Sequence, residues 1–200
     1  MAAVTRARDA APATWVFSEV TGDAVGPLVQ RVRSGDTRAY AKLVARFRDR
    51  LGRYAMRMLG NPADAEEAVQ DAFARGYRSL HRCDPPEQFG KWVFGILVNR
   101  CRTLGAQRAR RERRVVTADE LVARASVQAT DESLAWREAI EWAMARLTVE
   151  RREAFLLKYV EELSYDEMSK VTGATNAALK MRVLRAREDL RRLLSEVDHG

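Results

Sequence analysis

The residues whose types and spacing best suit them to bind another molecule lie near the C-terminal end, where basic side chains recur at helical spacing. One face of this stretch is apolar and is traced by Leu179, Val183, Ala186, Leu190 and Leu193. The other face carries Lys180, Met181, Leu184 and Arg185, flanked by Arg182 and Arg187. Such a helix can lie in the major groove, with its first residues at base edges and its arginines at phosphates. A basic, solvated face on an ordinary helical hairpin would give the same pattern.

The residues just before this helix predict how it is positioned. Ser164 can cap a short helix, and Glu167 three residues later completes a capping box. Gly173 permits a sharp turn, and Thr175 or Asn176 can cap the basic helix. The segment therefore predicts a helix-turn-helix.

A second cluster is acidic. Asp64, Glu66, Glu67 and Asp71 fall within eight positions that contain no basic residue. In a basic protein, such a helix is a poor DNA surface and a plausible docking face for a basic partner. Acids are also favoured in the first turn of any helix, which explains the first three better than Asp71.

A third cluster consists of arginines, at Arg100, Arg102, Arg108, Arg110, Arg111, Arg113 and Arg114. This density suits phosphate contacts, although a solvated charge run is the commoner explanation. The loop 81–89 and Trp92 lie nearby in sequence, and unpaired DNA is held by basic grooves with side chains that stack on bases. Trp92 shares its helical stripe with Phe89 and Ile96, so its default role is in the core.

Composition limits the remaining possibilities. The 200 residues contain 35 Lys+Arg and 28 Asp+Glu, a net charge of +7, which favours a polyanionic partner. No apolar stretch approaches the roughly 20 residues that cross a bilayer, and the first twelve residues lack a secretory signal, so we expect a cytoplasmic protein without membrane insertion. His81, Cys83 and Cys101 lack the spacing of a zinc site. We expect no metal, no cofactor and no enzymatic activity, because no catalytic constellation is present.

Apolar residues recur every three or four positions and no strand-like alternation occurs, which predicts an all-α fold. Helices are expected from Gly35 to Gly60, from Pro62 to Leu80, from Phe89 to Leu104, and then from Leu134 onward. The helical segments form two small domains, since their stripes need one another for burial. The predicted organisation is a flexible lead-in at 1–26, a first domain at 27–104, a basic linker at 105–132 and a second domain at 133–195.

Several motifs together resemble the extracytoplasmic-function (ECF) group of bacterial RNA polymerase sigma factors, in the sigma-70 family. They are Asp64–Phe73, Phe89–Trp92, Ile96–Asn99, Leu163–Met168 and Lys180–Arg187, in the order of the family. The resemblance implies sigma domain 2 followed by sigma domain 4, the latter containing the helix-turn-helix. It implies a protein that directs transcription initiation by binding core RNA polymerase and promoter DNA.

The resemblance also implies roles for single residues. Polymerase contacts, to the clamp helices of the largest subunit, are expected from Asp64, Glu67, Gln70 and Asp71. Contacts with the unpaired minus-ten element are expected from His81, Arg82, Gln88, Asn99 and Arg102. Contacts with the minus-thirty-five duplex are expected from Asn176, Lys180, Met181, Arg182, Leu184, Arg185 and Arg187. The resemblance further implies that the flap of the second subunit and an anti-sigma factor are partners.

The chain departs from the family pattern at a base-facing site. Small polar residues are frequent where Met181 stands, and its flexible apolar side chain favours contact with a thymine methyl group. The promoter sequence is therefore not transferable from relatives. The main alternative is a stand-alone helix-turn-helix regulator, which would bind duplex DNA tightly by itself, usually as a dimer. A protein that only binds other proteins, or an RNA-binding protein, explains fewer of these features.

Overall fold

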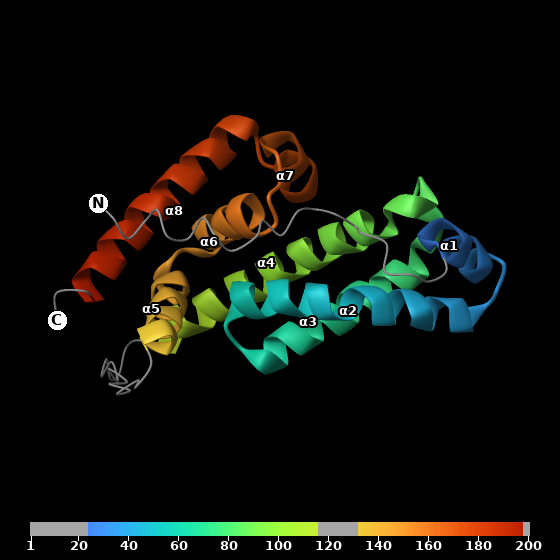
Figure 1. The fold of residues 1–200 in the computed structure, drawn as a ribbon, viewed down its shortest axis with the longest axis horizontal. Coiled ribbons are helices and arrows are strands. Elements are labelled where there is room, and N and C mark those ends of the chain that lie inside the picture. Colours follow the sequence, from blue (N-terminus) through green and yellow to red (C-terminus); the bar gives the residue numbers. More distant parts are fainter. Residues whose placement is uncertain (1–23, 116–131, 198–200) are drawn as a thin grey trace.

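The computed structural model describes residues 24–115 and 132–197, and every regular element in these ranges is helical (Figure 1). The prediction of an all-α fold is confirmed. The elements are α1 (Val25–Arg33), α2 (Thr37–Leu59), α3 (Pro62–Arg78), η2 (Leu80–Arg82), η3 (Pro86–Gln88), α4 (Phe89–Val115), α5 (Glu132–Arg146), α6 (Val149–Phe155), η4 (Leu156–Val160), α7 (Tyr165–Thr172) and α8 (Asn176–Val197).

The first domain consists of α1 to α4, and local signals set the ends of its helices. The Asp36 carboxylate caps α2 by accepting hydrogen bonds from the backbone amides of Arg38 and Ala39. Gly60 ends α2 in the left-handed conformation, at φ 65°, which glycine adopts without steric cost. The Asn61 side chain then caps α3.

Apolar stripes from all four helices meet in one core. Leu43 and Leu51 of α2 are fully buried, as are Val93 and Leu97 of α4. Tyr54 of α2 packs edge-on against Phe94, with 4.9 Å between the ring centroids. This packing fixes α3 and α4 side by side, so the acidic cluster on α3 faces the start of the arginine run on α4.

One helix end and one additional helix differ from the sequence prediction. Helix α4 continues to Val115, so the predicted end at Leu104 is wrong and the linker begins as helix. Residues with good helix propensity, mainly Ala, Gln and Arg, allow this continuation even though the apolar stripe fades. Helix α1 was not predicted, since the first expected helix began at Gly35 and residues 25 and 26 were assigned to the lead-in; α1 buries Leu28, Val29 and Val32. The other predicted linker residues, 116–131, and most of the lead-in lie outside the described residues.

The second domain consists of α5 to α8, and its helix-turn-helix is confirmed. Ser164 and Glu167 form the predicted capping box at the start of α7. Gly173 ends α7 at φ 72°, and α8 begins three residues later. The backbone amide of Ala178 donates to the Thr175 hydroxyl, so Thr175 caps α8. Leu179, Val183 and Ala186 are buried, as the apolar face predicts.

The two domains lie against each other. Helices α6 and α7 contact α4, and α6 also contacts α2 (Figure 1). Buried residues of both domains belong to one continuous cluster. Sequence periodicity predicts the two domains but not this mutual packing.

Candidate nucleic-acid and polymerase interfaces

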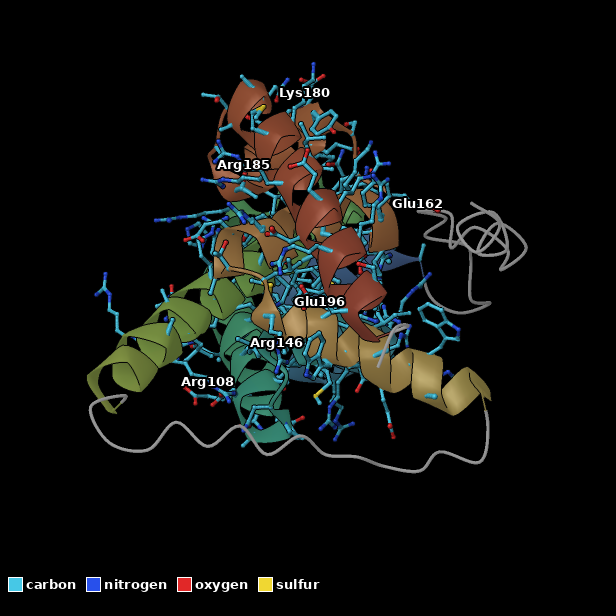
Figure 2. The ribbon with its side chains drawn as sticks, turned by 90° about the vertical axis from the view of Figure 1, so that its left-hand side faces the viewer. Arg108, Arg146, Glu162, Lys180, Arg185 and Glu196 are labelled. Atoms are coloured by element: carbon cyan, nitrogen blue, oxygen red, sulfur yellow. The ribbon has the colours of Figure 1, made fainter. Side chains whose placement is uncertain are left out.

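The outer face of α8 is a cationic surface open to solvent. Lys180, Arg185 and Arg187 are exposed, and neither arginine forms an ion pair within the described ranges. Figure 2 shows Lys180 and Arg185 on the part of α8 nearest the turn. Met181 and Leu184 are 47% and 44% exposed, which is unusual for large apolar side chains. This surface combines unpaired positive charge with apolar groups at the end of the helix that can enter a groove.

Three of the residues predicted to contact the minus-thirty-five duplex have partners inside the protein. The Asn176 side-chain nitrogen donates to Asp166 Oδ1 at 2.6 Å and ties α8 to α7. Lys180 Nζ lies 5.7 Å from the centroid of the Tyr165 ring on α7. Arg182 is half-buried, and its charge opposes the rise that burial causes in the pKa of Glu153. Asn176 therefore has a role in positioning α8, in addition to any contact with DNA.

Asn99 lines a hollow of about 380 Å³ between the end of α3 and the middle of α4. The hollow combines an amide, two hydroxyls, two guanidinium groups and an apolar wall, from Arg75, Ser79, Ile96, Asn99, Arg100 and Thr103. Amide and hydroxyl groups can hydrogen-bond the edge of an unpaired base, while guanidinium groups attract the phosphate beside it. Asn99 is itself exposed, so the hollow is open to solvent.

The other predicted minus-ten residues do not line this hollow. His81 and Arg82 in η2 and Gln88 in η3 are exposed. Arg33 of α1 holds their loop in place, since its guanidinium donates to the carbonyl oxygens of Leu80 and Cys83. These hydrogen bonds were not predicted, because nothing in the local sequence links α1 to a loop about 50 residues away.

Arg102, the last predicted minus-ten residue, is engaged by the second domain. Its Nε and Nη2 atoms donate to Glu153 Oε1 of α6, at 3.0 and 2.8 Å. Its Nη1 atom donates to the Thr172 carbonyl oxygen at 3.1 Å. Glu153 is 1% exposed; burial raises its pKa, and the Arg102 charge opposes that rise. Nothing in the local sequence indicates this pair, because Glu153 follows three other charged residues of α6, Glu150, Arg151 and Arg152.

The acidic cluster on α3 forms ion pairs with arginines of neighbouring helices. Glu67 Oε1 lies 2.7 Å from Arg100 Nη2, and Asp71 Oδ2 lies 2.9 Å from Arg100 Nε. Asp64 Oδ2 lies 3.7 Å from Arg108 Nη1. Arg100 was not predicted as a site residue, yet it joins two predicted docking residues to α4. The acids therefore help to hold α3 against α4.

A part of this cluster remains accessible. Glu67 and Gln70 are exposed, whereas Asp64 and Asp71 are half-buried. Gln70 donates to Glu66 Oε1, and this hydrogen bond, together with Arg48, lowers the pKa of Glu66. An exposed row of ionised carboxylates is what a basic helix of a partner would contact.

Neither cysteine shows the features of a reactive thiol. Cys83 and Cys101 are buried, and burial raises the pKa of Cys101 to about 12. Within the described ranges, no group of three or more His, Cys, Asp or Glu side chains is placed to hold a metal ion. In the same ranges, no helix is both long and apolar enough to span a bilayer.

Comparisons with known proteins agree with these two domains. The family profile for sigma-70 region 2 matches residues 43–115, and that for sigma-70 region 4 matches residues 137–190. RNA polymerase sigma factor CarQ of Myxococcus xanthus is 31% identical over 174 residues, covering 85% of this chain and 97% of CarQ. ECF RNA polymerase sigma factor SigW of Bacillus subtilis is 27% identical over 183 residues, covering 84% and 96%.

A solved structure has a similar fold. CnrH, in complex with the cytosolic domain of CnrY, superimposes with a TM-score of 0.60 at 25% identity, covering 87% of this chain and 99% of CnrH. The chain thus belongs to the sigma-70 family of RNA polymerase sigma factors. Within that family it is a member of the ECF group, and it functions in transcription initiation.

Proposed function

We propose that this ECF sigma factor uses three separate surfaces to bring core RNA polymerase to a promoter. The outer face of α8 reads the minus-thirty-five duplex, the hollow at Asn99 holds an unpaired minus-ten base, and the acidic face of α3 docks on the polymerase. The chain supplies specificity by binding and carries out no bond chemistry of its own. Because polymerase and promoter are in the cytoplasm, we infer that the protein acts there.

The observation that carries this proposal is the outer face of α8. Its arginines at 185 and 187 lack ion-pair partners in the described ranges, while most other arginines of the domain interfaces are paired. An unpaired guanidinium suits bidentate contact with guanine or with phosphate. Arg185 is therefore the best single test of this surface.

The polymerase contact is proposed on the clamp helices of the largest subunit. Glu67 and Gln70 are its accessible residues on α3. For the flap of the second subunit, α5 offers an apolar face, because Trp136 and Ile140 lie one helical turn apart and are 43% and 47% exposed. The complex of CnrH with CnrY supports a further proposal, that an anti-sigma factor binds this chain.

The α8 assignment is tested by reconstituting the chain with core polymerase and measuring run-off transcription. Arg185→Ala should lower transcription roughly 5- to 150-fold from a promoter that the wild-type protein uses. This change corresponds to a loss of about 1–3 kcal/mol of base discrimination. Binding to core polymerase should be unchanged. Arg191→Ala removes another exposed arginine of α8 and serves as the matched control. Equal losses in promoter use and in polymerase binding would contradict the assignment.

The alternative that the sequence offered was a stand-alone helix-turn-helix regulator, and the matches to both sigma-70 regions favour the sigma factor instead. Such a regulator predicts sequence-specific binding to duplex DNA by the isolated chain at physiological salt. The same preparation tests this by gel shift with and without polymerase, and binding that needs polymerase supports the sigma-factor proposal.

A further inference from the structure

We propose that helix α1, through Arg33, sharpens the minus-ten specificity of this protein by fixing the shape of the loop that joins α3 to α4. This loop, residues 80–88, contains η2 and η3 and carries His81, Arg82 and Gln88, three of the residues predicted to contact the unpaired element. Arg33 is a positioning residue, because it acts through the loop. The inference rests on the proposed binding of the minus-ten element by the first domain, whereas the shape of the loop can be measured without DNA.

Helix α1 is a rigid support for this loop. Leu28, Val29 and Val32 are buried in the core of the first domain. The end of α1 is also tied to α2, since Arg31 Nη2 lies 2.6 Å from Oδ2 of Asp36, whose side chain caps α2. Because buried side chains in a closely packed core have little room to move, any group attached to α1 is held at a defined position.

The Arg33 guanidinium holds the first half of the loop. Its Nη2 atom donates to the Leu80 carbonyl oxygen at 3.2 Å and to the Cys83 carbonyl oxygen at 2.5 Å. These two carbonyl groups lie at the start of η2 and just after its end. Leu80 and Cys83 are buried, whereas His81 and Arg82 between them are exposed. One charged donor thus fixes the backbone of η2 from the protein side, while two predicted DNA-contacting side chains face solvent.

The first turn of α1 holds the second half of the loop. A Cβ atom at Gly26 would lie 2.5 Å from Glu87 Oε1 and 3.1 Å from the Glu87 carboxyl carbon, so the Glu87 side chain fills the space that a larger residue would need. Helix α1 therefore contacts η3 near its beginning and η2 near its end (Figure 1). Both halves of the loop depend on the same helix.

A loop that is already in its binding shape binds more tightly and more selectively. If only a fraction of the molecules has the competent shape, the apparent affinity falls by that fraction. A loop that can rearrange around its ligand also accepts more than one base, since flexible surfaces bind promiscuously. Hydrogen bonds from a charged donor are about twice as strong as neutral ones, which suits Arg33 to keeping the loop in one shape.

Hydrogen exchange of the full-length chain without DNA tests whether Arg33 holds the loop. Arg33→Met keeps a long side chain but removes the donor, so the hydrogen-bonded amides of Arg82, Cys83 and Gln88 should exchange about tenfold faster. Arg33→Lys keeps the charge and a donor without the planar guanidinium, and it should recover part of the protection. Arg38→Met removes another exposed arginine, at the start of α2, and is the matched control.

Base selectivity is then measured with the protein bound to core polymerase. The probe is a fluorescent single-stranded oligonucleotide that carries the minus-ten element of a promoter used by the wild-type protein, together with versions in which each base is replaced in turn. Arg33→Met should reduce the preference for the native base about tenfold at the positions that the loop contacts, with Arg33→Lys in between. Binding to core polymerase should be unchanged. A general loss of folding would instead weaken polymerase binding and affect all oligonucleotides alike.

A second variant reaches the loop from its other end. Gly26→Val should force Glu87 away from α1 and disturb η3, which should also speed exchange and lower selectivity. Gly52→Val is its control, because Gly52 of α2 has no atom within 4 Å of its Cβ position.

Two results would overturn the proposal. One is loop exchange that neither Arg33→Met nor Gly26→Val changes, and the other is faster exchange with unchanged selectivity. A wild-type complex that shows no preference among the oligonucleotides would contradict the proposed minus-ten function, and with it the specificity role of Arg33. Hydrogen exchange would still decide in that case whether Arg33 holds the loop.

Discussion

Arg102 shows which properties of a single residue can be predicted from the sequence and which cannot. Sequence reasoning placed it at DNA because it stands in an arginine-rich run after Asn99, and the structure pairs it with Glu153. Charge type can be predicted from sequence, but the partner cannot, because these two residues are 51 positions apart. Asn99 is exposed, so it is accessible for the predicted contact with the minus-ten element, which stays a prediction.

The buried carboxyl of Glu153 makes a prediction about pH. Its pKa is raised in the folded protein, chiefly by burial, so the native state binds a proton more tightly than the unfolded state does. The stabilising contribution is present below the ordinary carboxyl pKa and is lost as the pH rises through the raised value. The wild-type protein should therefore gain stability relative to Glu153→Gln as the pH falls from neutral toward the ordinary carboxyl pKa of 4.5.

Chemical denaturation of both proteins across this pH range gives the difference directly. Glu188→Gln, a change at an exposed position of α8, should show no such trend. A difference between wild type and Glu153→Gln that is constant, or that shrinks as the pH falls, would contradict the assigned direction of the pKa.

At the scale of elements, local signals predicted most of the helices. The capping box at Ser164 and the left-handed Gly173 define α7 as expected, since capping depends on neighbours a few residues away. Two errors arose where a local signal was weak. Helix α1 is short and carries no side-chain cap, and the extension of α4 lacks an apolar stripe.

The cap of α7 can be tested by stability. Ser164→Ala removes the hydroxyl that accepts from the Glu167 amide, and it should lower the free energy of unfolding by about 1 kcal/mol. Thermal denaturation followed by circular dichroism would detect the loss. Ser195→Ala, near the end of α8, should change little, and an equal loss in both variants would argue against a special role for the cap.

The acidic face of α3 makes a prediction about docking. Substituting Asp71 would also break its ion pair with Arg100, so Gln70 is the cleaner position. Gln70→Arg adds a positive charge at an exposed site and should weaken binding to core polymerase by like-charge repulsion. The expected change is a severalfold rise in Kd that is reduced at high salt, measured by fluorescence anisotropy.

Ala41→Arg adds the same charge at an exposed position of α2 and is the control for this experiment. An unchanged Kd for Gln70→Arg, or an equal rise for both variants, would place the docking face elsewhere.

At the scale of the whole molecule, the sequence predicted two helical domains but not their mutual arrangement. Hydrophobic periodicity reports which face of a helix is buried, and it does not say which other helix covers that face. Glu153 and Glu161 are buried acids whose partners lie on the first domain, so their burial depends on the contact between the two domains.

The central claim is that this chain gives core polymerase its choice of promoter, and sequencing the 5′ ends of transcripts made in vitro tests it most directly. Core polymerase supplied with genomic DNA and this protein should start at a discrete set of sites sharing two upstream elements. Those starts should be absent without the protein and strongly reduced with Arg185→Ala. Starts that are scattered, or identical with and without the protein, would contradict the account.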